Sequence, residues 1–473
     1  MSSFILPPSS FPNEPLTPAL PRIRGRGVWF LVIREGNAQK KRSRMISALC
    51  PGLPAVRTNL GHLACLDVEL DQSGGYVNPM HIESLIQQQA GPATELRRRL
   101  HRIPELGYEE INTAAAIRDE LDKIGIKYIA GVEGAPTATI AWIGDPTKPC
   151  VALRADIDAL PIVEQTGLPY ASSYPGRMHA CGHDGHMSIL IGVASILKSI
   201  VDELPVCVKF IFQPAEEGGG GGNVLCKAGV LDGRIGPKVS AIFGIHGWPG
   251  LPLGCVSTRP GPLLAATDTF TATFIGKGCH AAFPHVGRDP VIAACEAVLN
   301  VQQFVTRELD PTEPCVVTIP VFNAGTASNV IPDRATITGT CRTLSDAARA
   351  QAQQSIRRRF AAIAAASACE VEINWDDGYP PTINDPRMAD YVADIARTSL
   401  GNDRYLPASR PAMGGEDFAY YLQKIPGCFF LIGVRPPGQS DSASLHSDRF
   451  DFTDAALPTG MRMFVELVRG FQP

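Results

Sequence analysis

The sequence contains no apolar run of the roughly 20 residues that a helix needs to cross a bilayer. The nearest approach is the short segment 27–33 (GVWFLVI), which follows three arginines as the core of a signal peptide would. Arg34 ends this segment, and no clean small-residue cleavage site follows it. We therefore predict neither a membrane partner nor a working signal peptide.

Neither sign of charge dominates the sequence, because it has 43 basic and 47 acidic residues and a net charge of -4. This balance gives no reason to expect nucleic acid or an anionic membrane surface as a partner. The thirteen cysteines are odd in number and include no C-x-x-C pair. Such cysteines are typical of reduced, buried thiols, so we predict a cytoplasmic protein without a disulfide framework.

The first 79 residues lack the hydrophobic periodicity that marks helices and strands. Six prolines crowd the first 21 positions, basic residues follow, and glycine and proline interrupt the remainder. This composition predicts a disordered N-terminal extension over residues 1–79. Because 473 residues exceed the size of one hydrophobic core, the rest of the chain is expected to form two domains.

Alternating helices and short apolar strands follow from residue 80. Helical spacing is seen at 81–103 and 108–124, and strands are predicted at 137–143, 150–153, 206–212 and 241–245. The same pattern resumes after residue 386, with a strand at 428–434. We predict an α/β domain whose mostly parallel sheet is covered by helices.

The pattern between residues 263 and 378 is different. Strands are predicted at 267–275, 315–322, 335–342 and 370–375, and helices at 290–308 and 346–366. The order β-α-β-β-α-β is that of the split βαβ, ferredoxin-like unit. We therefore predict a catalytic domain made of residues 80–262 and 379–473, with an α+β domain inserted at 263–378.

The densest chemical signal is the segment 178–187, MHACGHDGHM. It holds three of the ten histidines of the chain, one thiol and one carboxylate. Thiolate and imidazole suit zinc, nickel and similar transition metals. The segment precedes a predicted helix at 188–200, which would hold ligands on a rigid element. The alternative is a buried polar turn whose histidines are satisfied by hydrogen bonds.

Further candidate ligands follow other predicted strands. In a sheet of this kind the carboxyl ends of the strands meet at one crevice. Two metal ions need about five to seven ligands and an open position, and this crevice would offer Cys181, His183, Glu216, Glu217, His246 and His446. We predict two divalent metal ions here. Manganese and zinc are favoured, and cobalt and nickel stay possible.

Glu216 and Glu217 are adjacent, and neighbouring side chains of an extended segment point in opposite directions. One carboxylate can therefore bind metal while the other acts as general base toward a water molecule. A solvated surface pair is the alternative, but this pair follows a buried strand and a proline and precedes five glycines.

Eight segments together resemble one family in the right order: LRADIDALP, MHACGHDGHM, FQPAEEGGGGG, GIHGWPG, GKGCHAAFPHVGRDP, NVIPDRATITGTCRT, GGEDFAYYL and LHSDRFDFTD. The family is the amidohydrolase branch of the aminoacylase and carboxypeptidase-G metallopeptidase superfamily. Hippurate hydrolase and the plant indole-acetyl-amino-acid hydrolases belong to it. The resemblance covers about residues 80–470, and the first 79 residues match nothing in it.

The resemblance implies a role for each candidate. Glu216 becomes the general base, and Asp158 a carboxylate that orients a ligand. Asp156 stands where other branches carry a ligand histidine, so its role is open. The stretch 414–417 resembles the glycine turn beside the substrate pocket. The implied metal ligands are Cys181, His183, Glu217, His246 and His446.

The inserted domain carries further implied roles. His280 resembles a histidine that stabilises the oxyanion, unless it is simply a capped loop histidine. In several relatives it reaches the partner subunit's site, which implies a homodimer or homotetramer formed through this domain. Asn329 and Arg342 could hold a substrate carboxylate, although Arg342 could equally form a salt bridge between domains. Cys279 replaces the usual glycine, which leaves the substrate preference open, and His285 is expected to be structural.

The resulting prediction is a metal-dependent hydrolase that cleaves N-acyl amino acids to a carboxylic acid and a free amino acid. Benzoyl, acetyl and indole-acetyl groups are all possible acyl parts. A dipeptidase or carboxypeptidase on the same scaffold is the first alternative, since it needs the same machinery. A metal-binding protein without turnover is the second.

Overall fold

The structure is a computed structural model that describes residues 79–472 except 440–441. The predicted disordered extension therefore lies outside the described residues, apart from Pro79, which begins the first helix. Among the helices that the structure describes, none is long and apolar enough to cross a membrane.

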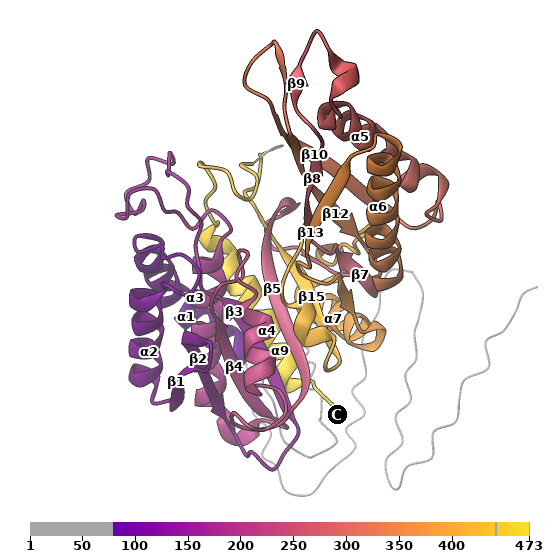
Figure 1. The fold of residues 1–473 in the computed structure, drawn as a ribbon. Coiled ribbons are helices and arrows are strands. Elements are labelled where there is room, and N and C mark those ends of the chain that lie inside the picture. The colour runs from indigo at the N-terminus through magenta and orange to yellow at the C-terminus, as the bar shows by residue number, and fades with distance from the viewer. Residues whose placement is uncertain (1–78, 440–441, 473) are drawn as a thin grey trace, which may run out of the picture. The chain divides into compact units, whose positions relative to one another are not determined.

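A seven-stranded sheet forms the larger part of the fold, with the order β1-β2-β4-β3-β5-β15-β6 (Figure 1). The four strands β4, β3, β5 and β15 run parallel, and the outer strands β1, β2 and β6 pair antiparallel. Its strands are β1 (Tyr128–Val132), β2 (Ala135–Ile143), β3 (Cys150–Asp156), β4 (Cys207–Gln213), β5 (Val239–Pro252), β6 (Val256–Ser257) and β15 (Gly427–Arg435). The prediction of a mostly parallel sheet is confirmed.

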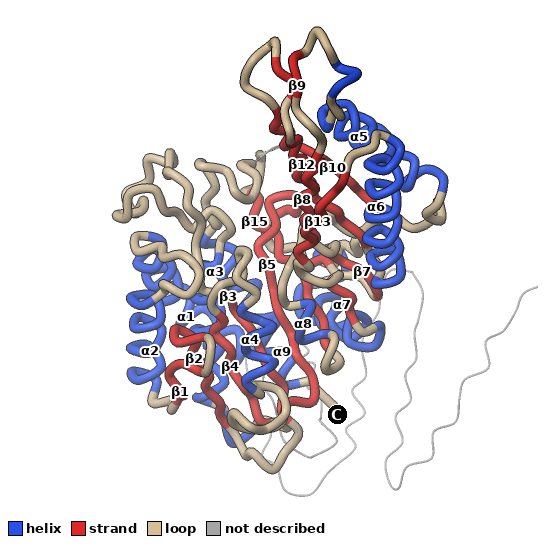
Figure 2. The backbone as a smooth tube through the Cα atoms, in the orientation of Figure 1, coloured by secondary structure: helices blue, strands red, loops and turns tan. Residues whose placement is uncertain are grey.

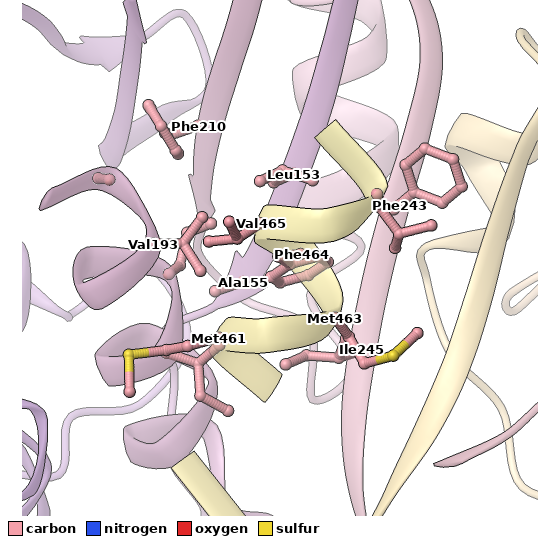
Figure 3. Close-up of a cluster of buried hydrophobic side chains, with 14 of the residues drawn as sticks. Leu153, Ala155, Val193, Phe210, Phe243, Ile245, Met461, Met463, Phe464 and Val465 are labelled. Atoms are coloured by element: carbon pink, nitrogen blue, oxygen red, sulfur yellow. The ribbon is translucent and has the colours of Figure 1, made fainter. Parts of the chain in front are cut away.

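Helices cover both faces of this sheet (Figure 2). They are α1 (Pro79–His101), α2 (Ile111–Ile124), α3 (His183–Ser199), α4 (Gly221–Ala228), α7 (Pro386–Leu400), α8 (Ala419–Leu422) and α9 (Leu457–Arg469). Alternate residues of β3 reach opposite faces: Leu153 packs in the core beneath α3 and α9, whereas Ala152 packs on the side of α4 and α8. Figure 3 shows Val193 of α3 and Val465 of α9 in the same buried cluster as Leu153.

The sequence pattern did not predict α4, because the helix is short and begins with two glycines. Gly220 takes a left-handed φ of 65°, and a Cβ on Gly221 would lie 1.8 Å from the carbonyl oxygen of Pro214. The glycine run thus lets the chain turn directly from the end of β4 into a helix.

A second sheet has the order β10-β12-β8-β13 with antiparallel pairing throughout. Its strands are β8 (Asp268–Ile275), β10 (Cys315–Ala324), β12 (Arg334–Thr343) and β13 (Glu370–Asp376), and two helices pack against it, α5 (Pro290–Arg307) and α6 (Asp346–Ala366). Since β12 lies between β8 and β10, the predicted ferredoxin-like order is confirmed. Two small sheets pair β7 (Gly261–Leu264) with β14 (Thr382–Asn384), and β9 (Cys279–His280) with β11 (Val330–Ile331).

A buried ionic network joins the end of α1 to the start of α3. Arg97 pairs with Asp184 at 2.9 Å, and His101 Nδ1 lies 2.8 Å from the same carboxylate. His101 Nε2 also lies 3.4 Å from Glu164. Although burial lowers the pKa of His101, the carboxylates of Asp184 and Glu164 raise it to about 9.

This pKa predicts a pH-dependent stability. Because the pKa of His101 is higher in the folded chain than in the unfolded one, its contribution is complete below about pH 6.5 and is lost as the pH rises through 9. Urea unfolding of chelated wild type and His101→Gln at pH 6 and pH 9.5 measures this effect. The wild type should be more stable than His101→Gln at pH 6, and this difference in unfolding free energy should be smaller at pH 9.5 by at most about 3 kcal/mol. An equal difference at both pH values would contradict the assignment.

Candidate active site

The predicted ligands meet where the parallel strands end. β4 delivers Glu216 and Glu217, β5 carries His246, and α3 begins at His183. Three overlapping groups of ligand atoms each lie within 4.8 Å: Cys181 with His183 and His246, Cys181 with Glu217 and His446, and His183 with Glu216 and Glu217. All six residues of the predicted crevice are therefore brought together.

The backbone takes an unusual conformation at two points of this cluster. Ala215, directly before the glutamates, has a φ of 54°, and His446 has a φ of 64°. Residues other than glycine rarely take a positive φ. They do so mainly where the surrounding structure requires it, often at functional sites. At the start of α3, Gly182 takes a φ of 85°, and the helix begins five residues earlier than predicted, at His183.

Two buried atoms of the cluster lack a hydrogen-bond partner: His183 Nε2 and Glu217 Oε1. The other nitrogen of His183 is held 2.9 Å from the Asp158 carbonyl oxygen. Glu217 Oε1 lies 4.0 Å from His183 Nε2 and 3.1 Å from His446 Nε2 without hydrogen-bond geometry. Unsatisfied buried polar atoms are costly, and a cation between them would satisfy both. The residues therefore fit divalent metal ions.

The two glutamates face different neighbours. Glu217 faces Cys181 and His446, whereas Glu216 is buried beside Glu416 and Asp417. The alternative of a solvated surface pair is therefore wrong. Burial, together with the charges of Glu416 and Glu217, raises the pKa of Glu216 well above its ordinary value. A carboxyl group in this setting accepts a proton readily, as a general base must.

Asp156 and His186 form a pair that sequence reasoning did not assign. His186 Nδ1 lies 2.7 Å from Asp156 Oδ1, and Nε2 accepts a hydrogen bond of 2.8 Å from the backbone N–H of Gly247. The pair therefore fixes the backbone directly after His246. The available signal was the spacing, since His186 stands three residues after His183 on the same helix.

Asp158, predicted to orient a ligand, lies between two candidate ligands. Its Oδ1 atom is 3.2 Å from His183 Nδ1, and its Oδ2 atom accepts a hydrogen bond of 2.8 Å from the backbone N–H of Glu217. The geometry suits the predicted role, which stays a prediction.

Arg154 is a fully buried cation behind the site, and sequence reasoning missed it. Its guanidinium lies 2.7 Å from Asp156, 3.0 Å from Glu416 and 2.9 Å from Asp417. Asp417 in turn accepts a hydrogen bond of 2.8 Å from the backbone N–H of Gly222. Arg154 thus ties the end of β3 to the 414–417 turn and to the start of α4.

Tyr379 also escaped the sequence analysis, although it lines the cavity of the site. Its hydroxyl donates to the Glu216 carbonyl oxygen and accepts from the backbone N–H groups of Gly218 at 2.8 Å and Gly220 at 3.2 Å. Its backbone is bonded to Thr267, which directly precedes β8. Tyr379 therefore connects the segments flanking the second sheet to the loop that carries the glutamates.

We expect Tyr379→Phe to lower kcat by up to about 10²-fold, because a buried hydrogen bond contributes about 1 kcal/mol and the loop would lose three of them. KM and bound metal should change little, since the ring still fills its place and no predicted ligand is removed. Steady-state kinetics with metal analysis tests this, with Tyr420→Phe as the matched control. The Tyr420 hydroxyl makes only a 3.5 Å contact to Gly378. Equal losses in both variants would argue against the positioning role.

A cavity of about 490 Å³ opens onto the cluster. Arg342 lines it from β12 and is half-buried, with its Nε 3.1 Å from Thr340. No carboxylate of the described residues pairs with Arg342, so the guanidinium is available to a ligand. The interdomain salt bridge considered for Arg342 is absent from this part of the chain.

His280 and Asn329 do not line this cavity. They share a separate hollow of about 400 Å³ beside β9 and β11, where the backbone N–H of Ala281 donates to the Asn329 carbonyl oxygen at 2.9 Å. The His280 side chain is exposed. Within a single chain, the structure therefore does not bring these two residues to the cluster.

The chain is similar to a known family and to several known proteins. The model of peptidase family M20/M25/M40 matches residues 152–470. This chain belongs to that family. IAA-amino acid hydrolase ILR1-like 4 from Arabidopsis thaliana is 41% identical over 376 residues, which span 79% of this chain and 84% of the relative. The predicted resemblance to the amidohydrolase branch is confirmed.

A bacterial relative and a solved structure extend the comparison. N-acetyl-L-cysteine deacetylase from Bacillus subtilis is 40% identical over 362 residues, covering 76% of this chain and 83% of that protein. The crystal structure of a dinuclear metal-binding peptidase of the M20 family from Bacillus subtilis has a TM-score of 0.70 and 37% identity. It covers 81% of this chain and 98% of its own.

Proposed function

We propose that this chain hydrolyses the amide bond of N-acyl amino acids to a carboxylic acid and a free amino acid. The relatives in plants and bacteria are named for the hydrolysis of acylated amino acids, in agreement with the prediction of a metal-dependent amide hydrolase. The observation that carries the proposal is the convergence of five candidate ligands beside the buried Glu216.

Two divalent metal ions, manganese or zinc, would be held by Cys181, His183, Glu217, His246 and His446. The similar dinuclear metal-binding peptidase from Bacillus subtilis supports the binding of two metal ions. Bound in this way, the metals would polarise an amide carbonyl and make water acidic enough to attack at neutral pH.

The side chains around the metals supply the remaining functions. Glu216 takes the proton of the attacking water and passes it to the leaving amine. Arg342, which lines the same cavity, binds the carboxylate of the amino acid. Asp158 keeps His183 oriented through Nδ1.

The proposal includes a second copy of the chain. His280 and Asn329 lie outside the cavity of their own subunit, so they serve the reaction only from a partner docked through the inserted domain, residues 263–378. In that assembly His280 stabilises the oxyanion, and the catalytic domain comprises residues 80–262 and 379–473. The enzyme acts in the cytoplasm, where its cysteines stay reduced.

Amino-acid release from a panel of N-acyl amino acids and dipeptides tests the proposal. Chelator-stripped enzyme is compared with enzyme restored with manganese, zinc, cobalt or nickel. Metal-restored release from acyl amino acids is the expected result. Release from dipeptides alone would replace the proposal with a peptidase, and metal binding without any release would leave a protein that only binds metal.

A further inference from the structure

A second and larger cavity adjoins the metal cavity. Its volume is about 820 Å³, compared with about 490 Å³ for the cavity at the cluster, and Trp248 and Leu264 line both. Met413 lines the larger cavity, and the next residue, Gly414, lines the metal cavity. The two cavities are therefore neighbours that share the side chains of Trp248 and Leu264.

The walls of this second cavity are mainly apolar. They include Leu251, Leu263, Leu344, Leu406, Pro407, Ala408, Pro411, Ala412, Met413 and Leu431. Arg410 is the one charged residue in the lining, and its side chain is exposed. Leu406 contributes a side chain that is 37% exposed.

The segment 405–413 forms one wall and is fixed to the main fold. The backbone N–H of Leu406 donates to Val256 at 2.9 Å, that of Ala408 to Thr258 at 3.0 Å, and that of Ala412 to Leu263 at 2.9 Å. Pro407 and Pro411 further restrict the backbone of this segment. The cavity is therefore bounded by anchored backbone and is largely formed before a ligand arrives, as small-molecule sites usually are.

We infer that this cavity binds the apolar part of an acyl group larger than acetyl, and this inference rests on the proposed function. The amino-acid carboxylate belongs in the metal cavity, because Arg342 lines that cavity and not the larger one. The apolar walls suit the opposite, uncharged end of the substrate. An acetyl group would leave the space filled by water against apolar walls, whereas a medium-chain or aromatic acyl group displaces that water.

Binding of a graded series of substrates tests the assignment. The metal-restored full-length Glu216→Gln enzyme is titrated with N-acetyl-, N-butanoyl-, N-hexanoyl- and N-octanoyl-L-alanine. We expect Kd to fall roughly three- to fourfold for each methylene buried. The same titration with Ala408→Phe added, which fills the cavity, should abolish this dependence and leave N-acetyl-L-alanine binding within twofold.

The controls separate the possible outcomes. Ala115→Phe, on the exposed side of α2, should behave as the parent enzyme, and Ala408→Val gives a smaller obstruction if the phenylalanine variant does not fold. A Kd independent of chain length, or an equal loss for all acyl groups in Ala408→Phe, would overturn the inference. A dependence that follows the amino-acid side chain in N-acetyl-alanine, -leucine and -phenylalanine would also overturn it.

The kinetic counterpart distinguishes this inference from the proposed function. Hydrolysis of all four alanine derivatives by the wild type at similar kcat/KM would leave the proposed function standing and remove the acyl cavity. If no compound of the series were bound or hydrolysed, both the acyl cavity and the proposed function would be contradicted.

Discussion

Glu216→Gln is expected to lower kcat about 10³-fold while the enzyme keeps its metal ions. The substitution preserves the size of the side chain but removes the group that accepts the water proton, and general bases contribute about 10² to 10⁴ in rate. Metal content should survive because Glu217, not Glu216, faces Cys181 and His446. Single-turnover kinetics on an N-acyl amino acid, with metal analysis of the same sample, measures both quantities.

The matched control for this substitution is Glu109→Gln. Glu109 is an exposed glutamate that pairs at the surface with Arg177 at 3.0 Å. Its substitution should leave turnover unchanged, because a surface ion pair contributes little. Near-normal turnover of Glu216→Gln with metal bound would remove Glu216 from the reaction.

His183→Ala is expected to bind fewer metal ions and to lose at least about 10³-fold in activity. His183 belongs to two of the ligand groups, and its buried Nε2 atom has no hydrogen-bond partner. Removing it takes away a ligand that no neighbour replaces, and activity that depends on the metals falls with it. The measurement is the number of metal ions per chain after dialysis, together with amino-acid release.

His81→Ala serves as the control, since His81 is exposed in the first turn of α1. It should keep both metal ions and full activity. If His183→Ala kept the same metal content as His81→Ala, the assignment of His183 as a ligand would be wrong.

Much of the site could be predicted because its residues follow buried strands. The carboxyl ends of parallel strands must meet, so the positions of Glu216, Glu217 and His246 after β4 and within β5 placed them together. The density of ligand residues in 178–187 located Cys181 and His183, and the segment LHSDRFDFTD supplied His446. The succession β-α-β-β-α-β along residues 263–378 likewise predicted the ferredoxin-like order of the second sheet.

Other parts could not be predicted, because their function depends on contacts that the sequence does not display. Arg154 stands in a buried strand and meets Asp417, 263 residues away. Tyr379 reaches the Glu216 loop across 163 residues. The large apolar cavity is bounded by an irregular segment, 405–413, whose period marks neither a helix nor a strand.

A metal titration tests the central claim most directly. Chelator-stripped full-length enzyme is titrated with manganese or zinc while release of the amino acid from one N-acyl amino acid is followed. The account predicts no release without metal and a rise that saturates at two ions per chain. Full activity of the stripped enzyme, or two bound ions with no release from any acyl amino acid, would contradict it.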